Sequence, residues 1–325
     1  MKQIEISDND SGQRLDKYLL KYFNKATKSF IYKMLRKKRI KLNGGKAEGN
    51  EMLSDGDTIQ MYLSEETMES FMEEKTVSDV KRTFDIVYED ENILVVNKPA
   101  GLLSHAEKKD DSNTLIDQIL SYLNEKGEYV PQKDSTFTPA LCNRLDRNTS
   151  GIVIAGKNSD AVRQLNAAIK DKKIRKYYKT IVCGKVTEGK RLESFYEKDG
   201  NKNKAYVSDK NGGKKIITVF KPLKHTDKYS LLEIELITGK SHQIRLHLKS
   251  EGIPIIGDIK YGNAAENRAF EKIGVKRQLL HAYKTVINGM NEKLEYLNGK
   301  EIFADIPEDF KRAEKKIFGI YNTYL

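Results

Sequence analysis

The sequence predicts an α+β protein in two parts, a small basic module and a larger domain built on a mixed, largely antiparallel sheet. Three features support this fold class. Residues 1–63 combine two short helical patterns with short strands. Residues 64–82 are rich in glutamate and show no regular period, as in a linker. Residues 83–325 mix strand-like and helical segments without the strict alternation of a doubly wound parallel sheet.

The basic module begins with two short predicted helices, because apolar residues recur at helical spacing. Thr27 or Ser29 can cap the second helix, whose far end is strongly positive, as suits a helix dipole. Tight turns at Asn43-Gly44-Gly45 and Asp55-Gly56-Asp57 then connect short strands. The apolar positions are Leu15, Leu19 and Phe23 in the first helix, Phe30, Ile31, Met34 and Leu35 in the second, and Ile40, Leu42, Ile59, Met61 and Leu63 in the strands.

This order of two helices and a hairpin, opened by Arg14-Leu15-Asp16, resembles the αL RNA-binding domain of ribosomal protein S4 and of many RNA-modifying enzymes. Residues 1–63 contain 13 Lys/Arg and 8 Asp/Glu, a net charge of +5. The resemblance implies that this module binds RNA, whereas the alternative is a solvated pair of amphipathic helices. The candidate contacts are Arg14, Lys33, Arg36, Lys37 and Arg39.

The larger domain should contain at least six strands and two helices. Short apolar and β-branched runs predict the strands, and longer runs with apolar residues at helical spacing predict the helices. The expected strands are 86–88, 93–96, 152–155, 178–183, 216–220 and 231–237, and the expected helices are 114–124 and 159–170.

Charge and hydropathy limit the classes of partner. The net charge is +11 and the pI is about 9.2, which favours a polyanion such as nucleic acid, although a lysine-rich genome would give the same surplus. The N-terminal residues are polar, unlike a signal peptide, and no apolar run approaches the 18 or so residues of a membrane span. We therefore expect a cytoplasmic monomer that does not associate with membranes.

The sequence offers no pattern of metal ligands. Cys142 and Cys183 are far apart and flanked by apolar residues, so we expect both to be reduced core residues. His242 and His247 lie five positions apart without a third ligand nearby. We expect neither a metal nor an organic cofactor.

The densest cluster of polar residues is Asn143-Arg144-Leu145-Asp146-Arg147-Asn148-Thr149-Ser150-Gly151, directly before a predicted strand. The pattern alone is typical of an ordinary turn. However, the cluster resembles the H-R-L-D-x-x-T-S-G motif of ribosomal large-subunit pseudouridine synthases of the RluA/RluC/RluD type. In that family the aspartate is the catalytic nucleophile, and Asp146 occupies its position.

Further stretches match the same family in the expected order, over about residues 84–305. The resemblance implies a pseudouridine synthase fold, with Tyr178 stacking on the uracil and Arg245 supplying a cation beside Asp146. It also implies that Lys98, His242 and Gln243 bind substrate. The matching stretches are Asn97-Lys98-Pro99-Ala100-Gly101, Lys176-Tyr177-Tyr178, Thr238-Gly239-Lys240-Ser241-His242-Gln243-Ile244-Arg245, Ile256-Gly257-Asp258, Tyr261-Gly262 and Leu280-His281-Ala282.

A carboxylate suits the breaking of a glycosidic bond, because it can attack C1′ or take a proton from C2′, and the sequence leaves both routes open. Either route needs an ionised Asp146, which favours a nearby cation. The resemblance implies that Arg144 fills the gap left by the extruded base, and that Asn143 stands where the family has histidine. Ribosomal RNA is the favoured substrate, with transfer RNA and a catalytically silent RNA-binding or ribosome-assembly factor as alternatives.

Overall fold

The computed structural model describes residues 1–73, 76–108, 110–131, 136–199, 204–208 and 213–319. The chain forms two compact units, and each is described by itself below. Unit 1 comprises Met1–Arg82, Asp117–Ala140 and Gly156–Arg163, and unit 2 comprises Thr83–Ile116, Leu141–Ala155 and Gln164–Leu325.

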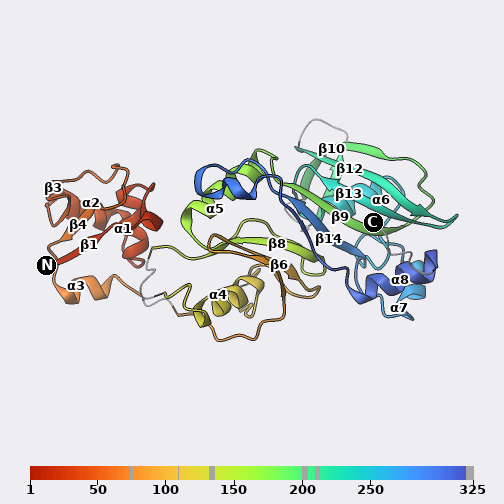
Figure 1. Ribbon diagram of the computed structural model, residues 1–325, viewed down its shortest axis with the longest axis horizontal. Helices are drawn as coiled ribbons and strands as arrows, with labels where there is room; N and C mark the ends of the chain where they lie inside the picture. Colours follow the sequence, from red (N-terminus) through yellow and green to blue (C-terminus); the bar gives the residue numbers. More distant parts are fainter. Residues whose placement is uncertain (74–75, 109, 132–135, 200–203, 209–212, 320–325) are drawn as a thin grey trace. The chain divides into compact units, whose positions relative to one another are not determined.

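The N-terminal part of unit 1 is a helix pair on a small antiparallel sheet (Figure 1). The helices are α1 (Leu15–Tyr22) and α2 (Lys28–Arg36), and the Thr27 hydroxyl caps α2 by accepting a hydrogen bond from the Phe30 amide at 3.3 Å. The predicted helices and strands of this module are confirmed. The sheet has the order β1 (Lys2–Glu5), β4 (Thr58–Met61), β2 (Ile40–Leu42), β3 (Gly45–Lys46), and a 3-10 turn, η1, spans Asp8–Asp10.

The core of this module contains the apolar positions that the helical spacing predicted. Leu15, Leu19 and Phe23 of the first stripe are all at most 2% exposed, as are Ile31 and Leu35 of the second. Burial of each such side chain contributes about 1.5 to 3 kcal/mol. The hydrophobic effect therefore holds both helices against the sheet.

A short helix, α3 (Glu65–Ser70), lies in the segment expected to be a linker. The Ser64 hydroxyl caps it by accepting a hydrogen bond from the Thr67 amide, and Met68 packs into the core of the N-terminal module. Six residues are too few to display a helical period, so the sequence did not reveal this helix.

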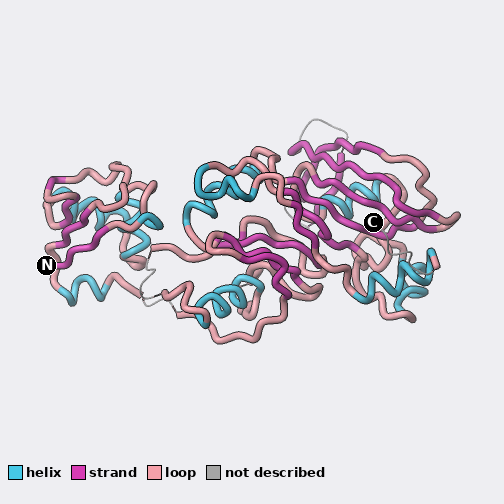
Figure 2. Tube along the Cα trace, in the orientation of Figure 1, coloured by secondary structure: helices cyan, strands magenta, loops and turns pink. Residues whose placement is uncertain are grey.

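Unit 2 is organised around one large twisted sheet, which Figures 1 and 2 show as a run of adjacent strands. The sheet is mixed and mostly antiparallel as predicted, because the pair β8–β14 is parallel whereas β9 and β10 to β13 pair in antiparallel fashion. Its order is β11 (Lys204–Ser208), β10 (Lys190–Asp199), β12 (Lys214–His225), β13 (Tyr229–Leu236), β9 (Arg175–Cys183), β14 (Leu280–Val286), β8 (Ser150–Gly156), β6 (Ile93–Lys98), β5 (Asp85–Glu89), with β15 (Glu301–Phe303) beside β14 and β7 (Ala140–Leu141) beside β8.

Helix α6 (Gln243–Ser250) is fixed to strand β12 by buried polar contacts. The Gln243 side chain donates a hydrogen bond to the Ile217 carbonyl at 3.0 Å, and the His247 ring shares one with the Thr218 hydroxyl at 2.8 Å. These contacts orient the first turn of α6, where the site described below begins. The other helical segments are α4 (Leu115–Glu125), α5 (Ser159–Lys170), α7 (Ala264–Glu271), α8 (Glu308–Phe318) and the 3-10 helix η2 (Glu292–Leu297).

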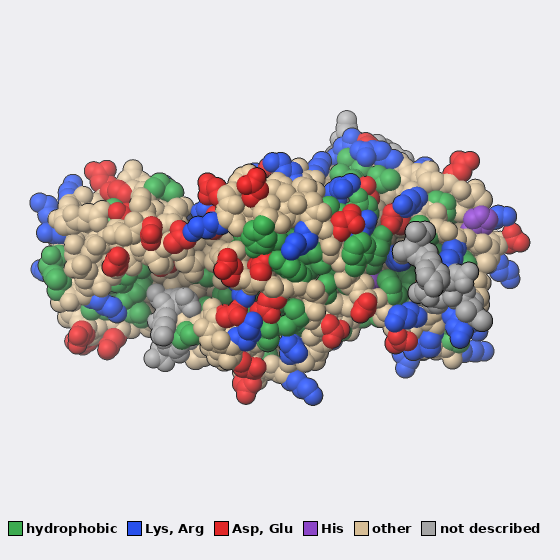
Figure 3. All heavy atoms as spheres, viewed as in Figure 1, with side chains coloured by type: hydrophobic (Ala, Val, Ile, Leu, Met, Phe, Trp, Pro, Cys, Tyr) green, Lys and Arg blue, Asp and Glu red, His purple; other side chains and the backbone are tan. Residues whose placement is uncertain are grey.

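Neither cysteine forms a disulfide, and both side chains are only partly buried. Cys183 packs against a buried apolar cluster of unit 2, so the predicted core position is wrong only for Cys142. Cys142 lies at the edge of a cavity, where a core position was expected. Among the described residues, no helix is long and apolar enough to cross a membrane. Figure 3 shows basic and acidic side chains interspersed over one face, so the positive surplus forms no single continuous patch in that view.

Candidate active site

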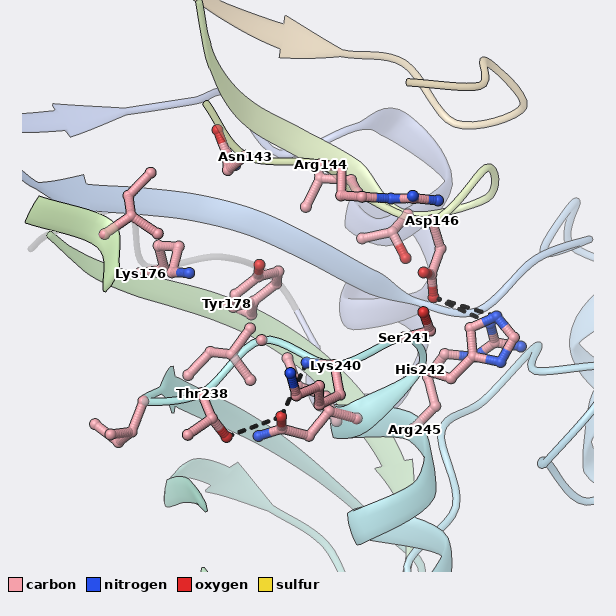
Figure 4. A pocket seen from close by; sticks show the side chains of 18 of the residues that line it. Asn143, Arg144, Asp146, Lys176, Tyr178, Thr238, Lys240, Ser241, His242 and Arg245 are labelled. Atoms are coloured by element: carbon pink, nitrogen blue, oxygen red, sulfur yellow. Dashed lines mark hydrogen bonds and ion pairs between the residues drawn. The ribbon is translucent and has the colours of Figure 1, made fainter. Parts of the chain in front are cut away.

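A cavity of about 580 Å³ opens in unit 2 beside the loop that contains Asp146. Figure 4 shows part of its walls, which come from segments far apart in the sequence. The segments include the loop 142–146, strand β9 and the stretch 236–245 that leads into α6, together with residues around 170 and 214. The fold therefore brings Asp146, Tyr178 and Arg245 to one cavity, as their motifs predicted.

The loop around Asp146 is held in place by backbone contacts. The Leu145 amide donates a hydrogen bond to the Ser104 hydroxyl, which in turn donates one to the Leu145 carbonyl at 2.9 Å. Gly151, at the end of the loop, has φ +117°, and a Cβ there would lie 2.2 Å from the Ala282 carbonyl oxygen. Only glycine fits such an approach, so Gly151 lets β8 pass next to β14 directly after the loop.

Asp146 forms an ion pair with Arg245. The distance from Arg245 Nη1 to Asp146 Oδ2 is 3.2 Å, and the Asp146 side chain keeps 27% of its surface exposed to the cavity. His242 Nε2 lies 3.8 Å from the same carboxylate oxygen. The guanidinium therefore places a positive charge directly beside the carboxylate, which remains accessible to a substrate.

Arg245 is itself fixed by Asp258. Arg245 Nε and Nη2 donate to the two Asp258 oxygens at 2.7 and 2.9 Å, a bidentate pair in which Asp258 is 1% exposed. Burial tends to lower the pKa of Arg245, but the hydrogen bonds and charge of Asp258, helped by Asp146, raise it above its usual value. The guanidinium is therefore charged and points at Asp146 without needing substrate to orient it.

Tyr178 forms one wall of the cavity from strand β9. It is 5% exposed, and its pKa is raised by burial and, secondarily, by the charge of Asp146. Its hydroxyl has no hydrogen-bond partner among the described residues. Tyr178 thus presents a neutral aromatic ring and a hydroxyl beside the carboxylate.

His242 connects Asp146 to a second tyrosine. The His242 ring shares a hydrogen bond with the Tyr261 hydroxyl at 3.0 Å, and its backbone has φ 58° at the start of α6. Burial lowers the pKa of His242 despite the opposing charge of Asp146. His242 is therefore mostly neutral near pH 7. Its ring faces the Asp146 carboxylate and lines the cavity in which we predicted that it binds substrate.

Three residues expected to bind substrate have side chains that support the backbone. The Lys98 ammonium is fully buried and donates to the carbonyls of Pro99, Leu102 and Arg147, outside the cavity lining. The side-chain amide of Asn143 donates a hydrogen bond to the Ile152 carbonyl, and its oxygen accepts one from the backbone amide of Ile154. Gln243 also accepts hydrogen bonds from the Thr238 hydroxyl and the Lys240 amide. These contacts shape the loops around the cavity.

The basic side chains predicted to contact RNA differ in whether they already pair with a carboxylate. Arg144 is exposed at the cavity rim, and Figure 4 shows its side chain beside Asp146. Arg14 instead forms a bidentate pair with buried Asp16, at 3.0 and 3.1 Å. The exposed cations at the end of α2, which we call the α2 basic cluster, have no carboxylate partner within the described residues: Lys33, Arg36, Lys37 and Arg39.

The sequence did not single out two groups at this site. The first is Asp258, whose Gly-Asp motif was visible but whose role as the partner of Arg245 depends on the fold. The second is a set of cavity-lining lysines spread over four segments: Lys170, Lys172, Lys176, Lys214 and Lys240. No single stretch of sequence contains enough of them to signal a site.

Comparison with known proteins identifies the same two regions. The RNA pseudouridylate synthase family matches residues 92–250, and the S4 domain family matches residues 13–59. Ribosomal large subunit pseudouridine synthase C of Rickettsia bellii is 36% identical over 93% of this chain and 97% of its own length. Ribosomal large subunit pseudouridine synthase D of Borreliella burgdorferi is 31% identical over 94% of this chain and 90% of its own length.

Solved structures share the fold at lower identity. Human RNA pseudouridylate synthase domain containing 4 superposes with a TM-score of 0.55 at 21% identity, over 71% of this chain and 92% of its own. Human RNA pseudouridylate synthase domain containing 1 gives 0.51 at 20% identity, over 75% and 97%.

Proposed function

The chain belongs to the RNA pseudouridylate synthase family, and on that basis we propose that it isomerises uridines in large-subunit ribosomal RNA with Asp146 as the catalytic carboxylate. The names of the bacterial relatives support this choice of RNA. The observation that supports Asp146 is its ion pair with Arg245 in an open cavity next to Tyr178.

The geometry favours glycosidic bond cleavage at Asp146. In one route an Asp146 oxygen bonds to C1′ as the C1′–N1 bond breaks, and the electron pair leaves with N1 of the uracil. The base then turns, C5 bonds to C1′, the carboxylate is released, and the C5 proton passes to a base. In the other route the carboxylate takes the C2′ proton as the C1′–N1 bond breaks, which gives a glycal. Both routes use a negatively charged carboxylate, and the Arg245 guanidinium lies beside Asp146.

The freed uracil needs a surface on which to turn. Tyr178 can supply it, because stacking of a base on an aromatic ring contributes about 1 to 3 kcal/mol without fixing the orientation of the ring. Extrusion of the uridine from its stack costs a few kcal/mol. The exposed Arg144 can offset part of this cost by filling the vacated space.

We propose that the N-terminal module contributes affinity for RNA and takes no part in the chemistry. The boundaries that we propose are 1–63 for this module, 64–82 for the connecting segment and 83–325 for the catalytic domain. The S4 family match lies within the first range. The α2 basic cluster is free to pair with phosphates, which is the usual source of non-specific affinity for RNA. Arg14, tied to Asp16, contributes less to RNA binding than we expected.

The test is to map pseudouridines in all RNA from strains with and without the gene. We expect one or more pseudouridines of the large-subunit RNA to disappear on deletion and to return with the wild-type gene. Sites lost only from transfer RNA would replace ribosomal RNA as the substrate. Loss of no site would support the silent-factor alternative and refute the proposed activity.

A further inference from the structure

The segment 277–282 contains the motif Leu280-His281-Ala282, which has no part in the chemistry proposed above. Side chains of this segment contact three consecutive residues where the loop 142–149, which we call the Asp146 loop, passes into β8. The contacts join Arg277 Nη1 to the Asn148 carbonyl at 3.3 Å, Gln278 Nε2 to the Thr149 hydroxyl at 3.2 Å and His281 Nδ1 to the Ser150 hydroxyl at 2.9 Å. We call this set of three contacts the rear anchor.

The rear anchor is shielded from water, because Gln278, His281 and both of their hydroxyl partners are at most 3% exposed. A hydrogen bond in such surroundings cannot be replaced by one to water, so its loss leaves a buried polar group without a partner. Arg277 is held in turn by Asp309 at the start of α8. Its Nε and Nη2 lie 2.7 and 2.8 Å from the two carboxylate oxygens, a bidentate pair that fixes the guanidinium.

The contact between His281 and Ser150 has one direction. His281 Nε2 lies 3.4 Å from the Ala304 carbonyl oxygen, which can only accept a hydrogen bond, so Nε2 carries the ring proton. Burial lowers the pKa of His281 to about 4, so the ring is neutral near pH 7 and Nδ1 accepts from the Ser150 hydroxyl. His281 and Ser150 also pair in register where β8 meets β14. The rear anchor therefore fixes the point at which the Asp146 loop ends.

A second set of contacts holds the earlier part of the Asp146 loop. Ser104 exchanges hydrogen bonds with the Leu145 backbone, and the Gly101 amide donates to the Arg147 carbonyl at 2.9 Å. Asp146 lies between these contacts and those of the rear anchor. The position of its backbone therefore depends on both.

We propose that Arg277, Gln278 and His281 are positioning residues, which hold the Asp146 loop so that its carboxylate faces C1′ and C2′ of the target nucleotide. This inference rests on the proposed function, because it gives a purpose to the direction of that carboxylate. None of the three belongs to the described lining of the cavity, so their effect on the reaction passes through the loop. A displacement of about 1 Å at a reacting group can slow a reaction about 100-fold, so anchoring of this kind affects the rate.

The test uses Ser150→Ala, Gln278→Met and the double variant. Ser150→Ala removes the hydroxyl that His281 binds, and Gln278→Met removes the donor to Thr149 with little change in side-chain volume. Both changes leave the residues that line the cavity as they are.

Ser230→Ala is the matched control. The buried Ser230 hydroxyl also forms hydrogen bonds within unit 2, to the Gly184 carbonyl and from the Val186 amide, each at 2.8 Å, and neither partner belongs to the Asp146 loop. Each protein is compared with the wild type by urea unfolding, filter binding and single-turnover tritium release at saturating RNA. The probe is large-subunit ribosomal RNA from a strain that lacks the gene, labelled with 5-tritiated uridine.

We expect each single variant to slow the maximal release rate about three- to tenfold, and the double variant to slow it about 10- to 100-fold. The Kd should stay within about twofold of the wild-type value, because the rear anchor does not reach the cavity. Ser230→Ala loses two buried hydrogen bonds, so it should lose at least as much stability as Ser150→Ala but keep the wild-type rate. An unchanged rate in the double variant, or an equal loss of rate in Ser230→Ala, would overturn the proposal. If the double variant does not fold, the single variants decide by the same comparison.

Hydrogen exchange of the peptide that spans the Asp146 loop separates this proposal from the proposed function. The Leu145 and Thr149 amides donate to the Ser104 hydroxyl and the Asp146 carbonyl, so loosening of the loop should speed their exchange. We expect faster exchange in the double variant than in Ser230→Ala, and equal exchange would overturn the proposal whatever the substrate is. If the wild type releases no tritium, the choice of RNA is wrong, and exchange still decides whether the rear anchor holds the loop.

Discussion

Removal of the Arg245 guanidinium should separate its structural and catalytic contributions. In Arg245→Met, Asp258 loses a bidentate partner while remaining buried, which costs about 3 to 5 kcal/mol for a buried pair. Asp258 keeps hydrogen bonds from the amides of Lys260 and Tyr261 at 2.9 Å, so we expect the lower end of that range. Urea unfolding measures this loss of stability.

The same substitution removes the cation 3.2 Å from Asp146. Loss of one charge-assisted hydrogen bond, worth about 1.5 to 3 kcal/mol, should slow isomerisation roughly 10- to 100-fold at neutral pH. Single-turnover tritium release at neutral pH measures this loss of rate.

The double variant Arg245→Met with Asp258→Asn is the control, because it also removes the buried charge of Asp258. It should regain most of the lost stability but none of the lost activity. A folded Arg245→Met protein with the wild-type rate would show that Arg245 does not assist Asp146.

Three other sets of substitutions test separate parts of the structure. Tyr178→Phe keeps the stacking ring and Tyr178→Ala removes it, so tritium release should fall further in the Ala variant, and full activity of both would make Tyr178 a packing residue. Gly151→Ala should lower the free energy of unfolding by at least about 2 kcal/mol more than Gly101→Ala, since both have positive φ but only Gly151 faces backbone within 4 Å. Changing the α2 basic cluster to Gln should weaken RNA binding and flatten its salt dependence at an unchanged rate on saturating RNA, whereas equal salt slopes would remove this cluster from the RNA interface.

Much of the fold could be predicted because local patterns and packing agree. Helix α5 runs from Ser159 to Lys170, as its apolar spacing predicted, and the strands near 93–96 and 152–155 are buried strands inside the sheet, as continuous apolar runs indicate. The family was also predicted correctly from the motifs, and the mixed sheet from the absence of a strict alternation of strands and helices.

The elements that escaped prediction have weak local signals. Strand β10 is rich in charge, because it lies near the edge of the sheet and has little to bury. Helix α6 has only eight residues, and its N-cap residue, His242, is in a left-handed conformation. The family motif in this segment was more informative than the spacing of its apolar residues.

The site, like the fold, could be predicted only where the sequence carries a local signal. Asp146 and Arg245 are 99 residues apart, and only their motifs placed them together before the structure formed the pair. Sequence could not reveal that Lys98, Asn143 and Gln243 turn toward the backbone, because the direction of a side chain depends on its tertiary neighbours. Nor could it reveal the cavity-lining lysines, which come together only in the folded chain.

The most direct test of the account is tritium release from 5-tritiated uridine in large-subunit ribosomal RNA by the wild type and by Asp146→Asn. This change preserves the volume of the side chain and removes the negative charge that either route requires. We expect the wild type to release tritium and the variant to release none above background, with RNA affinity and unfolding free energy close to those of the wild type. Release by Asp146→Asn at a rate near that of the wild type would contradict the assignment of Asp146 as the catalytic carboxylate.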